Sequence, residues 1–258
     1  MGYSRNGYIW TPTRRDVLRT AGGVLAAGLL APRIARAATF SLLSHVGGSC
    51  GSTSPQTTAT LNTTGADLLI LGLAYDGAAT FDLWASLWTD SQGNTWVPLT
   101  VQTSPKAQIW YCKPSSVGSG HTVTIVSDNS GGIYLAAYFA AFSGSASSAF
   151  DLQNGAANTA TSPGSITPSV DNALVISVVS SGSATPTVDA AMTVLDNNAV
   201  AGGRSWGGGM AYKIQTTVAA INPVWTGSAA CVIASFKSTS SSGGGGSTPV
   251  RRRVIGGE

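Results

Sequence analysis

The sequence predicts an all-β protein, an antiparallel two-sheet β-sandwich of jelly-roll type, on three observations. The body of the chain is rich in Gly, Ser, Thr, Ala and Val and has no glutamate, a composition that favours strands over helices. Short apolar runs recur between clusters of Gly, Ser, Asn and Pro, which is typical of a sandwich or barrel. Several of these runs alternate apolar and polar residues, as a strand with one buried face does.

An export signal is predicted over residues 1–37, before the sandwich begins. Arg14 and Arg15 precede an apolar run that is well short of the ~20 residues of a membrane-spanning helix. Ala35 and Ala37 then form an A-x-A cleavage pattern. This order of features resembles the twin-arginine (Tat) signals of exported bacterial proteins. The resemblance implies a periplasmic, cell-surface or extracellular protein with no transmembrane segment in the mature chain.

Eleven candidate strands follow, each bounded by turn residues. The run 121–127 is a strand because Val123 and Ile125 share one face while threonines occupy the other. The run 132–143 is apolar on both faces, which favours a central strand covered on both sides, with a short helix as the alternative. No repeat period is evident. In chain order the strands are expected at 39–46, 68–75, 81–89, 95–101, 107–113, 121–127, 132–143, 173–180, 192–195, 209–216 and 229–238.

The domain division follows from this pattern: a signal at 1–37, a sandwich at 38–238, and a Ser/Gly linker with a basic tail at 239–258. The linker has no apolar side chains to bury and predicts a flexible coil. The tail run Arg251 to Arg253 is interpreted as a disordered end or as a docking peptide for an acidic partner or anionic lipid.

The net charge of +3 comes from the two ends of the chain. Six of the 14 Lys and Arg residues lie in the export signal and three in the tail, while the body sets five basic residues against nine aspartates. Nucleic-acid binding needs a basic patch that neutralises phosphates. The mildly acidic body is therefore not expected to bind nucleic acid.

Five short motifs carry a family resemblance. The chain reads TDSQGNTW at 89–96, IWY at 109–111, HTVTI at 121–125, AFSG at 141–144 and IASFK at 233–237. With these motifs the body resembles the jelly-roll or immunoglobulin-like modules of bacterial surface proteins, adhesins and phage virion appendages. The resemblance implies a fold and an extracellular setting, and it does not assign an activity.

Two groups of side chains are candidates for ligand binding. On a period of two, Asp82, Trp84 and Trp88 share one strand face, and such a face suits a glycan because aromatic rings cover the apolar side of a pyranose while carboxylates accept its hydroxyl hydrogens. One alternative is that both tryptophans are buried beneath a loop or the facing sheet. Another is a helix, whose spacing would place Phe81, Trp84, Ala85 and Trp88 on one stripe. Arg204 and Trp206 lie in a glycine-rich loop, which is either a contact point or a simple connector.

No catalytic or metal constellation is predicted. Residues 90–94 offer one carboxylate and several amides, which is half of a calcium loop, but a turn with Gly93 or Asn94 at positive φ explains them more simply. Residues 47–51 match the letters of a Gly-x-Ser-x-Gly elbow, yet the helix that this elbow requires does not follow. A glycine-rich turn is the preferred interpretation there, and no cofactor is expected.

The three cysteines, Cys50, Cys112 and Cys231, are too few for a disulfide scaffold. The preferred single bridge joins Cys50 to Cys231, because chain ends often pair as neighbouring strands. The alternative is three small buried thiols.

The sequence thus predicts a non-catalytic exported sandwich that binds a glycan or another surface polymer. The first alternative is a self-assembling structural subunit of a fibre, surface layer or phage particle. The second is a secreted hydrolase, which would bring His45 or His121 together with an aspartate or serine in a pocket.

Overall fold

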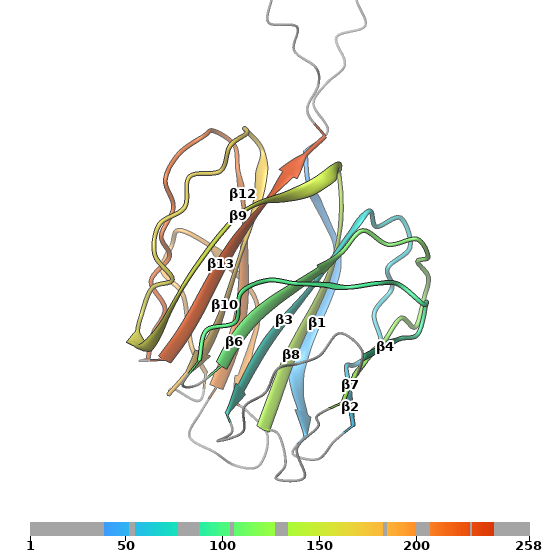
Figure 1. Cartoon of the computed structure of the whole chain (residues 1–258), viewed down its shortest axis with the longest axis horizontal. Helices are drawn as coiled ribbons and strands as arrows, with labels where there is room; N and C mark the ends of the chain where they lie inside the picture. Colours follow the sequence, from blue (N-terminus) through green and yellow to red (C-terminus); the bar gives the residue numbers. More distant parts are fainter. Residues whose placement is uncertain are drawn as a thin grey trace, which may run out of the picture. The chain divides into compact units, whose positions relative to one another are not determined.

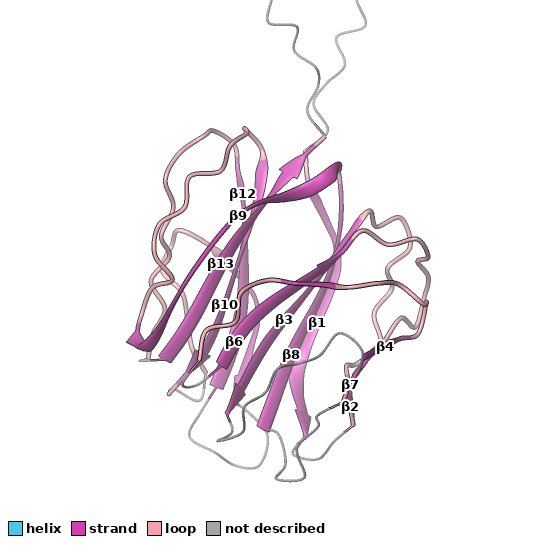
Figure 2. Ribbon diagram, viewed as in Figure 1, coloured by secondary structure: helices cyan, strands magenta, loops and turns pink. Residues whose placement is uncertain are grey.

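Thirteen strands and no helix make up the described part of the chain (Figure 2). The computed structural model describes residues 39–51, 55–76, 88–103, 106–126, 134–182, 185–199, 207–227 and 229–239. All of them belong to the second of two units into which the chain divides, Ala37–Glu258. The predicted export signal and the tail beyond Thr239 lie outside the described residues. Among the described residues, no helix is long and apolar enough to cross a membrane.

Two five-stranded antiparallel sheets face each other and a small ribbon flanks them (Figure 1). The first sheet has the order β1-β8-β3-β6-β5, the second β11-β12-β10-β13-β9, and the ribbon β2-β7-β4. The strands of the first sheet are β1 (Ser41–Gly51), β8 (Tyr134–Ser143), β3 (Leu68–Asp76), β6 (Lys106–Cys112) and β5 (Val97–Pro98). Those of the second are β11 (Thr193–Ala199), β12 (Gly207–Gln215), β10 (Ala173–Ser181), β13 (Ala229–Ser238) and β9 (Ser145–Ala160). The ribbon consists of β2 (Gln56–Thr57), β7 (Val123–Ile125) and β4 (Trp88–Asp90).

The predicted all-β sandwich is confirmed. The structure also shows how the strands are divided between the sheets, which the sequence did not reveal. Each sheet comes from one half of the chain: the strands β1 to β8 supply the first sheet and the ribbon, and β9 to β13 supply the second sheet. Three elements differ from expectation: the turn at 47–51 and two strands, β2 and β9, that were not predicted. The predicted turn at 47–51 is wrong, since β1 continues through these residues to Gly51. The strand β9, 16 residues long, was not predicted, because its sequence is mostly polar.

Both faces of each sheet are buried. Inward-facing side chains of the two sheets form a central core, which includes Ile70, Phe142, Ile176 and Phe236. The opposite faces are covered by connecting segments instead of water, which gives two further clusters. The first outer layer covers the first sheet and is formed by Leu61, Leu69, Leu71, Trp96, Trp110, Cys112, Val123, Ile125 and Phe139 with their neighbours. The second outer layer covers the second sheet and contains Ile166, Val175, Val179, Met192, Ala211, Ile221, Trp225, Cys231 and Ile233.

The two halves of the chain share one sheet topology. The strand orders of the two sheets can be aligned, β5-β6-β3-β8-β1 with β11-β12-β10-β13-β9. Each strand of the first sheet then has a partner in the second, and the partners follow one another along the chain in the same order. Short sequence matches agree with this pairing: Gly47 on β1 corresponds to Gly155 on β9, and Pro55 and Pro163 follow them at the same spacing. No repeat period is evident in the sequence because the repeat lies in the topology and in a few positions only.

The sandwich has two distinct ends. Chain entry, the junction of the halves and chain exit meet at one end, since Thr239 donates its N–H to the Gly144 carbonyl at 2.9 Å and Gly144 lies against Thr39. The opposite end, here called the rim, is formed by the paired strand ends of both sheets (Figure 1). Its members are Gly51, Asp76, Lys106, Tyr134, Ser181 and Gly207.

Candidate functional site

The sequence-predicted tryptophan face belongs to the connection between β3 and β4. Asp82 and Trp84 lie outside the described residues, and of Trp88 only the backbone is described, which begins β4 and pairs with Ile125. The strand that leads into this connection ends on the rim at Asp76. The connection thus leaves from the rim and re-enters the fold in the ribbon that covers the first sheet.

The second predicted pair, Arg204 and Trp206, belongs to the connection between β11 and β12. Both residues lie outside the described residues. The strand β12 begins on the rim at Gly207, and there the two sheets approach closely: a Cβ placed on Gly208 would lie 2.5 Å from the Cβ of Ala74 on β3. The described strand ends therefore bring two connections that are distant in sequence to the same end of the sandwich.

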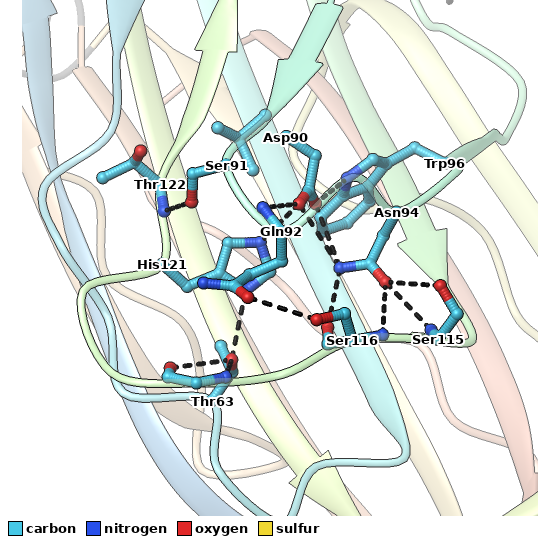
Figure 3. Close-up of polar contacts among 12 residues, drawn as sticks. Thr63, Asp90, Ser91, Gln92, Asn94, Trp96, Ser115, Ser116, His121 and Thr122 are labelled. Carbon is cyan, nitrogen blue, oxygen red and sulfur yellow. Dashed lines mark hydrogen bonds and ion pairs between the residues drawn. The ribbon is translucent and has the colours of Figure 1, made fainter.

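Asp90 fixes the turn that follows β4 (Figure 3). Its carboxylate accepts the Gln92 N–H at 2.7 Å, the Trp96 indole N–H at 2.8 Å and the Asn94 amide at 3.3 Å. Gly93 adopts a left-handed conformation with φ 74° and donates its N–H to the Asp90 carbonyl at 2.9 Å. The predicted turn is confirmed, and these protein donors account for the residue types at 90–94.

Asn94 ties this turn to a neighbouring segment. Its side-chain oxygen accepts the backbone N–H groups of Ser115 at 2.9 Å and Ser116 at 3.0 Å, and its amide donates to the Ser116 carbonyl at 2.9 Å. Figure 3 shows these contacts on the side of Asp90 away from Thr122. The side chains of two turn residues, Asp90 and Asn94, thus hold the turn in place.

His121 connects Asp90 to the interior of the first outer layer. Its Nε2 lies 2.9 Å from the Asp90 carboxylate, a close electrostatic approach between side chains that are 0% and 2% exposed. Its Nδ1 lies 3.0 Å from the Thr63 hydroxyl, and its ring packs edge-on against Phe139 with centroids 5.1 Å apart. Thr63 in turn bonds both backbone groups of Gly118. Asp90, His121 and Thr63 are called the buried polar network below.

The hydrogen-bond direction of the Thr63 hydroxyl determines which ring nitrogen of a neutral His121 carries the proton. The hydroxyl has one hydrogen, which goes either to the Gly118 carbonyl at 3.1 Å or to His121 Nδ1. In the second case the neutral imidazole carries its proton on Nε2, facing Asp90. The network resembles a hydroxyl–histidine–aspartate triad in connectivity, but its burial keeps substrates from the hydroxyl. Its role is therefore structural or positional.

A second histidine–aspartate pair lies at the edge of the sandwich. His45 Nδ1 on β1 is 2.8 Å from the Asp196 carboxylate on β11, with side chains 37% and 26% exposed. Nearby, the Tyr138 hydroxyl donates to Asn198 at 2.7 Å. Burial, with smaller effects from Asp196 and Cys50, raises the Tyr138 pKa well above its usual range. These two bonds join the sheets across one edge.

The opposite edge uses an uncharged equivalent of the His45 contact. There Gln153 on β9 accepts the Thr100 backbone N–H at 2.9 Å. Gln153 matches His45 in the repeat, since His45 pairs with Ala140 and Gln153 with Ala234 at corresponding positions of β8 and β13. The His45 pair is thus a cross-sheet contact, and among its described contacts no serine or cysteine joins the imidazole.

The predicted bridge between Cys50 and Cys231 is not formed. All three cysteines are free; Cys50 packs against the first outer layer and Cys231 lies in the second. The two residues are on strands of different sheets and in different clusters, so the expectation that chain-end strands would bring them together is wrong. The alternative of small unpaired thiols fits the structure better, with Cys112 and Cys231 buried and Cys50 half-buried.

We expect the native thiols to react slowly with iodoacetamide at pH 8. Burial raises the pKa of Cys50 to about 11 and that of Cys112 and Cys231 to about 12, so each thiol stays protonated and the thiolate that attacks the reagent is scarce. Mass spectrometry should find unlabelled native protein and triply labelled protein in urea. A disulfide-bonded species under non-reducing conditions would contradict the assignment.

No group of three or more His, Cys, Asp or Glu side chains among the described residues is arranged to hold a metal ion. Comparison with protein-family models, with curated proteins and with solved structures found no match. The functional argument therefore rests on the chain itself.

Proposed function

We propose that the protein is an exported, non-catalytic sandwich that binds a glycan or another surface polymer at its rim. The observation that carries the proposal is the convergence of strand ends: the connection with Asp82, Trp84 and Trp88 leaves from β3, and that with Arg204 and Trp206 enters β12, at the same end. Aromatic rings with carboxylate and guanidinium groups are the side chains that carbohydrate recognition uses.

Burial of both sheets supports the rim as the binding surface. The first outer layer covers one sheet and the second covers the other, so neither sheet presents a bare face to a polymer. Thr39 and Thr239, the first and last described residues, lie at the opposite end of the sandwich. A protein attached or extended through its chain ends would therefore present the rim outward.

The edges of the sheets disfavour the alternative of assembly by strand addition. Each long edge strand is irregular: β1 has register shifts near Leu42 and Ser49, β11 has one near Val194, and β9 has three. The remaining edge, β5, is two residues long and contains Pro98. Bulges, short strands and proline are the devices by which sheets avoid edge-to-edge pairing.

Replacing Trp84 with alanine should weaken glycan binding strongly. On a glycan array we expect the wild-type protein to give a defined signal and the Trp84→Ala variant to lose about tenfold or more, because an aromatic anchor dominates such contacts. Val218→Ala removes an apolar side chain that is 50% exposed in a loop beyond β12 and serves as the control with an unchanged signal. A silent wild-type array, or equal loss in both variants, would overturn the proposal.

A further inference from the structure

The repeated topology provides an internal comparison for the buried polar network. His121 and Leu61 exchange backbone hydrogen bonds, both at 2.9 Å, and in the second half Ile221 and Ile166 exchange the same pair of bonds at 2.9 and 3.1 Å. In the first half the bridge joins the segment before β3 to the segment that leads to β8. In the second half it joins the segment before β10 to the segment before β13. His121 therefore occupies the position that Ile221 occupies in the other half.

The second half fills this position with apolar side chains. Ile221 is 5% exposed and packs with Ile166 and Trp225 in the second outer layer. The topology thus folds around an isoleucine as well as around a histidine. A buried polar pair is seldom the most stabilising way to fill such a site, since apolar groups of similar size do as well or better. The network in the first half therefore calls for a reason other than the fold.

That reason lies in the connection that the network terminates. Asp90 comes two residues after Trp88, where the connection from β3 re-enters the fold. In the second half the corresponding connection runs from Ser181 to the bridge between Val188 and Trp225 and is shorter. The turn there also has an aspartate, Asp189, which accepts the Ala191 N–H at 3.2 Å but is exposed and has no histidine partner among its described contacts.

We propose that the buried polar network is a positioning device, which fixes the backbone at Trp88 and the turn at 90–94, where the chain re-enters the fold after the connection from β3. His121 links Asp90 to Thr63 on one side and to Phe139 of β8 on the other, so the start of β4 is fastened to the centre of the first sheet. A binding segment fixed before the ligand arrives loses less conformational entropy on binding. This role rests on the proposed glycan binding at the rim.

The test replaces His121 by the residue of the other half. In His121→Ile, Asp90 keeps its bonds to Gln92, Asn94 and Trp96, and Thr63 keeps those to Gly118, so the sandwich should fold. We expect amide exchange of residues 88–96 to accelerate about tenfold more than that of β10, since a loss of overall stability accelerates both segments alike, and glycan affinity to fall by about tenfold. His121→Gln, which retains a donor toward Asp90, should restore both.

Two outcomes would overturn the positioning role. Equal acceleration of exchange at 88–96 and in β10 in His121→Ile would mean that the network only stabilises the fold as a whole, and unchanged exchange at 88–96 would mean that it fixes nothing there. Thr63→Val removes one hydroxyl and gives the same comparison should His121→Ile fail to fold. If the wild-type protein binds no glycan, the proposed function fails, while the exchange measurement still decides the positioning role.

Discussion

Replacing Asp90 with alanine is expected to lower the free energy of unfolding by about 4 kcal/mol, because removing one partner of a buried pair leaves the other without compensation. His121 would lose its carboxylate, and the donors of Gln92, Asn94 and Trp96 would lose their acceptor. Each buried donor left unpaired adds its own desolvation cost. Urea denaturation of wild type and variant measures the difference directly.

The exposed pair of the same residue types provides the control. Asp196 also contacts a histidine, His45, at 2.8 Å, but both side chains reach water. Exposed ion pairs contribute little, so Asp196→Ala should cost about 1 kcal/mol or less. Equal losses in Asp90→Ala and Asp196→Ala would show that burial does not distinguish the two pairs.

Replacing Gly144 with alanine is the second substitution with a large expected effect, a loss of about 3 kcal/mol. Gly144 joins the two halves between β8 and β9 with φ 95°, a conformation that L side chains rarely adopt. A Cβ there would lie 2.5 Å from the Thr39 carbonyl oxygen and 3.0 Å from its carbon. Because these are backbone atoms, the clash cannot be relieved by a rotamer change.

Two other glycines separate the contributions of conformation and clash. Gly120 has φ 72° but open space around its missing Cβ, so Gly120→Ala should cost about 1 kcal/mol. Gly48 lies in β1, also with open space and without a positive φ, and Gly48→Ala should change stability by less than about 0.5 kcal/mol. Thermal unfolding of the three variants should rank them in this order. A Gly144→Ala variant as stable as Gly120→Ala would remove the clash from the explanation.

The central strands could be predicted from the sequence because they are apolar enough to be recognised locally. Predicted 68–75 is observed as Leu68–Asp76, 173–180 as Ala173–Ser181, and 229–238 as Ala229–Ser238. Their side chains are buried on both faces, and such runs have a clear length and clear ends. Local sequence also predicted the turn after β4, because Asp, Gly and Asn are residues that favour turns.

Edge strands and the repeat could not be predicted in this way. The strand β9 has exposed polar positions and three register shifts, so no period of two survives in its sequence. The repeat is hidden because equivalent positions carry different residues, such as His121 and Ile221 or Trp110 and Ala211. The two halves thus share a strand order but carry different side chains at equivalent positions.

The buried polar network was also beyond the sequence. Asp90 was recognised as a turn residue and His121 as the start of a strand, but their contact depends on the pairing of β4 with β7. Thr63 has no local signal at all, since it lies in a loop and reaches His121 through tertiary packing. Contacts between segments distant in sequence require the sheet register, which local pattern does not supply.

The location of the ligand on the sandwich is the most direct test of the account. With isotope-labelled protein and the glycan that gives the strongest array signal, amide chemical shifts should change most at Tyr75, Ser181 and Gly207, whose strand ends form or adjoin the rim. Shifts centred on Phe40, Gly144 and the other residues of the chain-end side, or spread over either outer layer, would contradict binding at the rim.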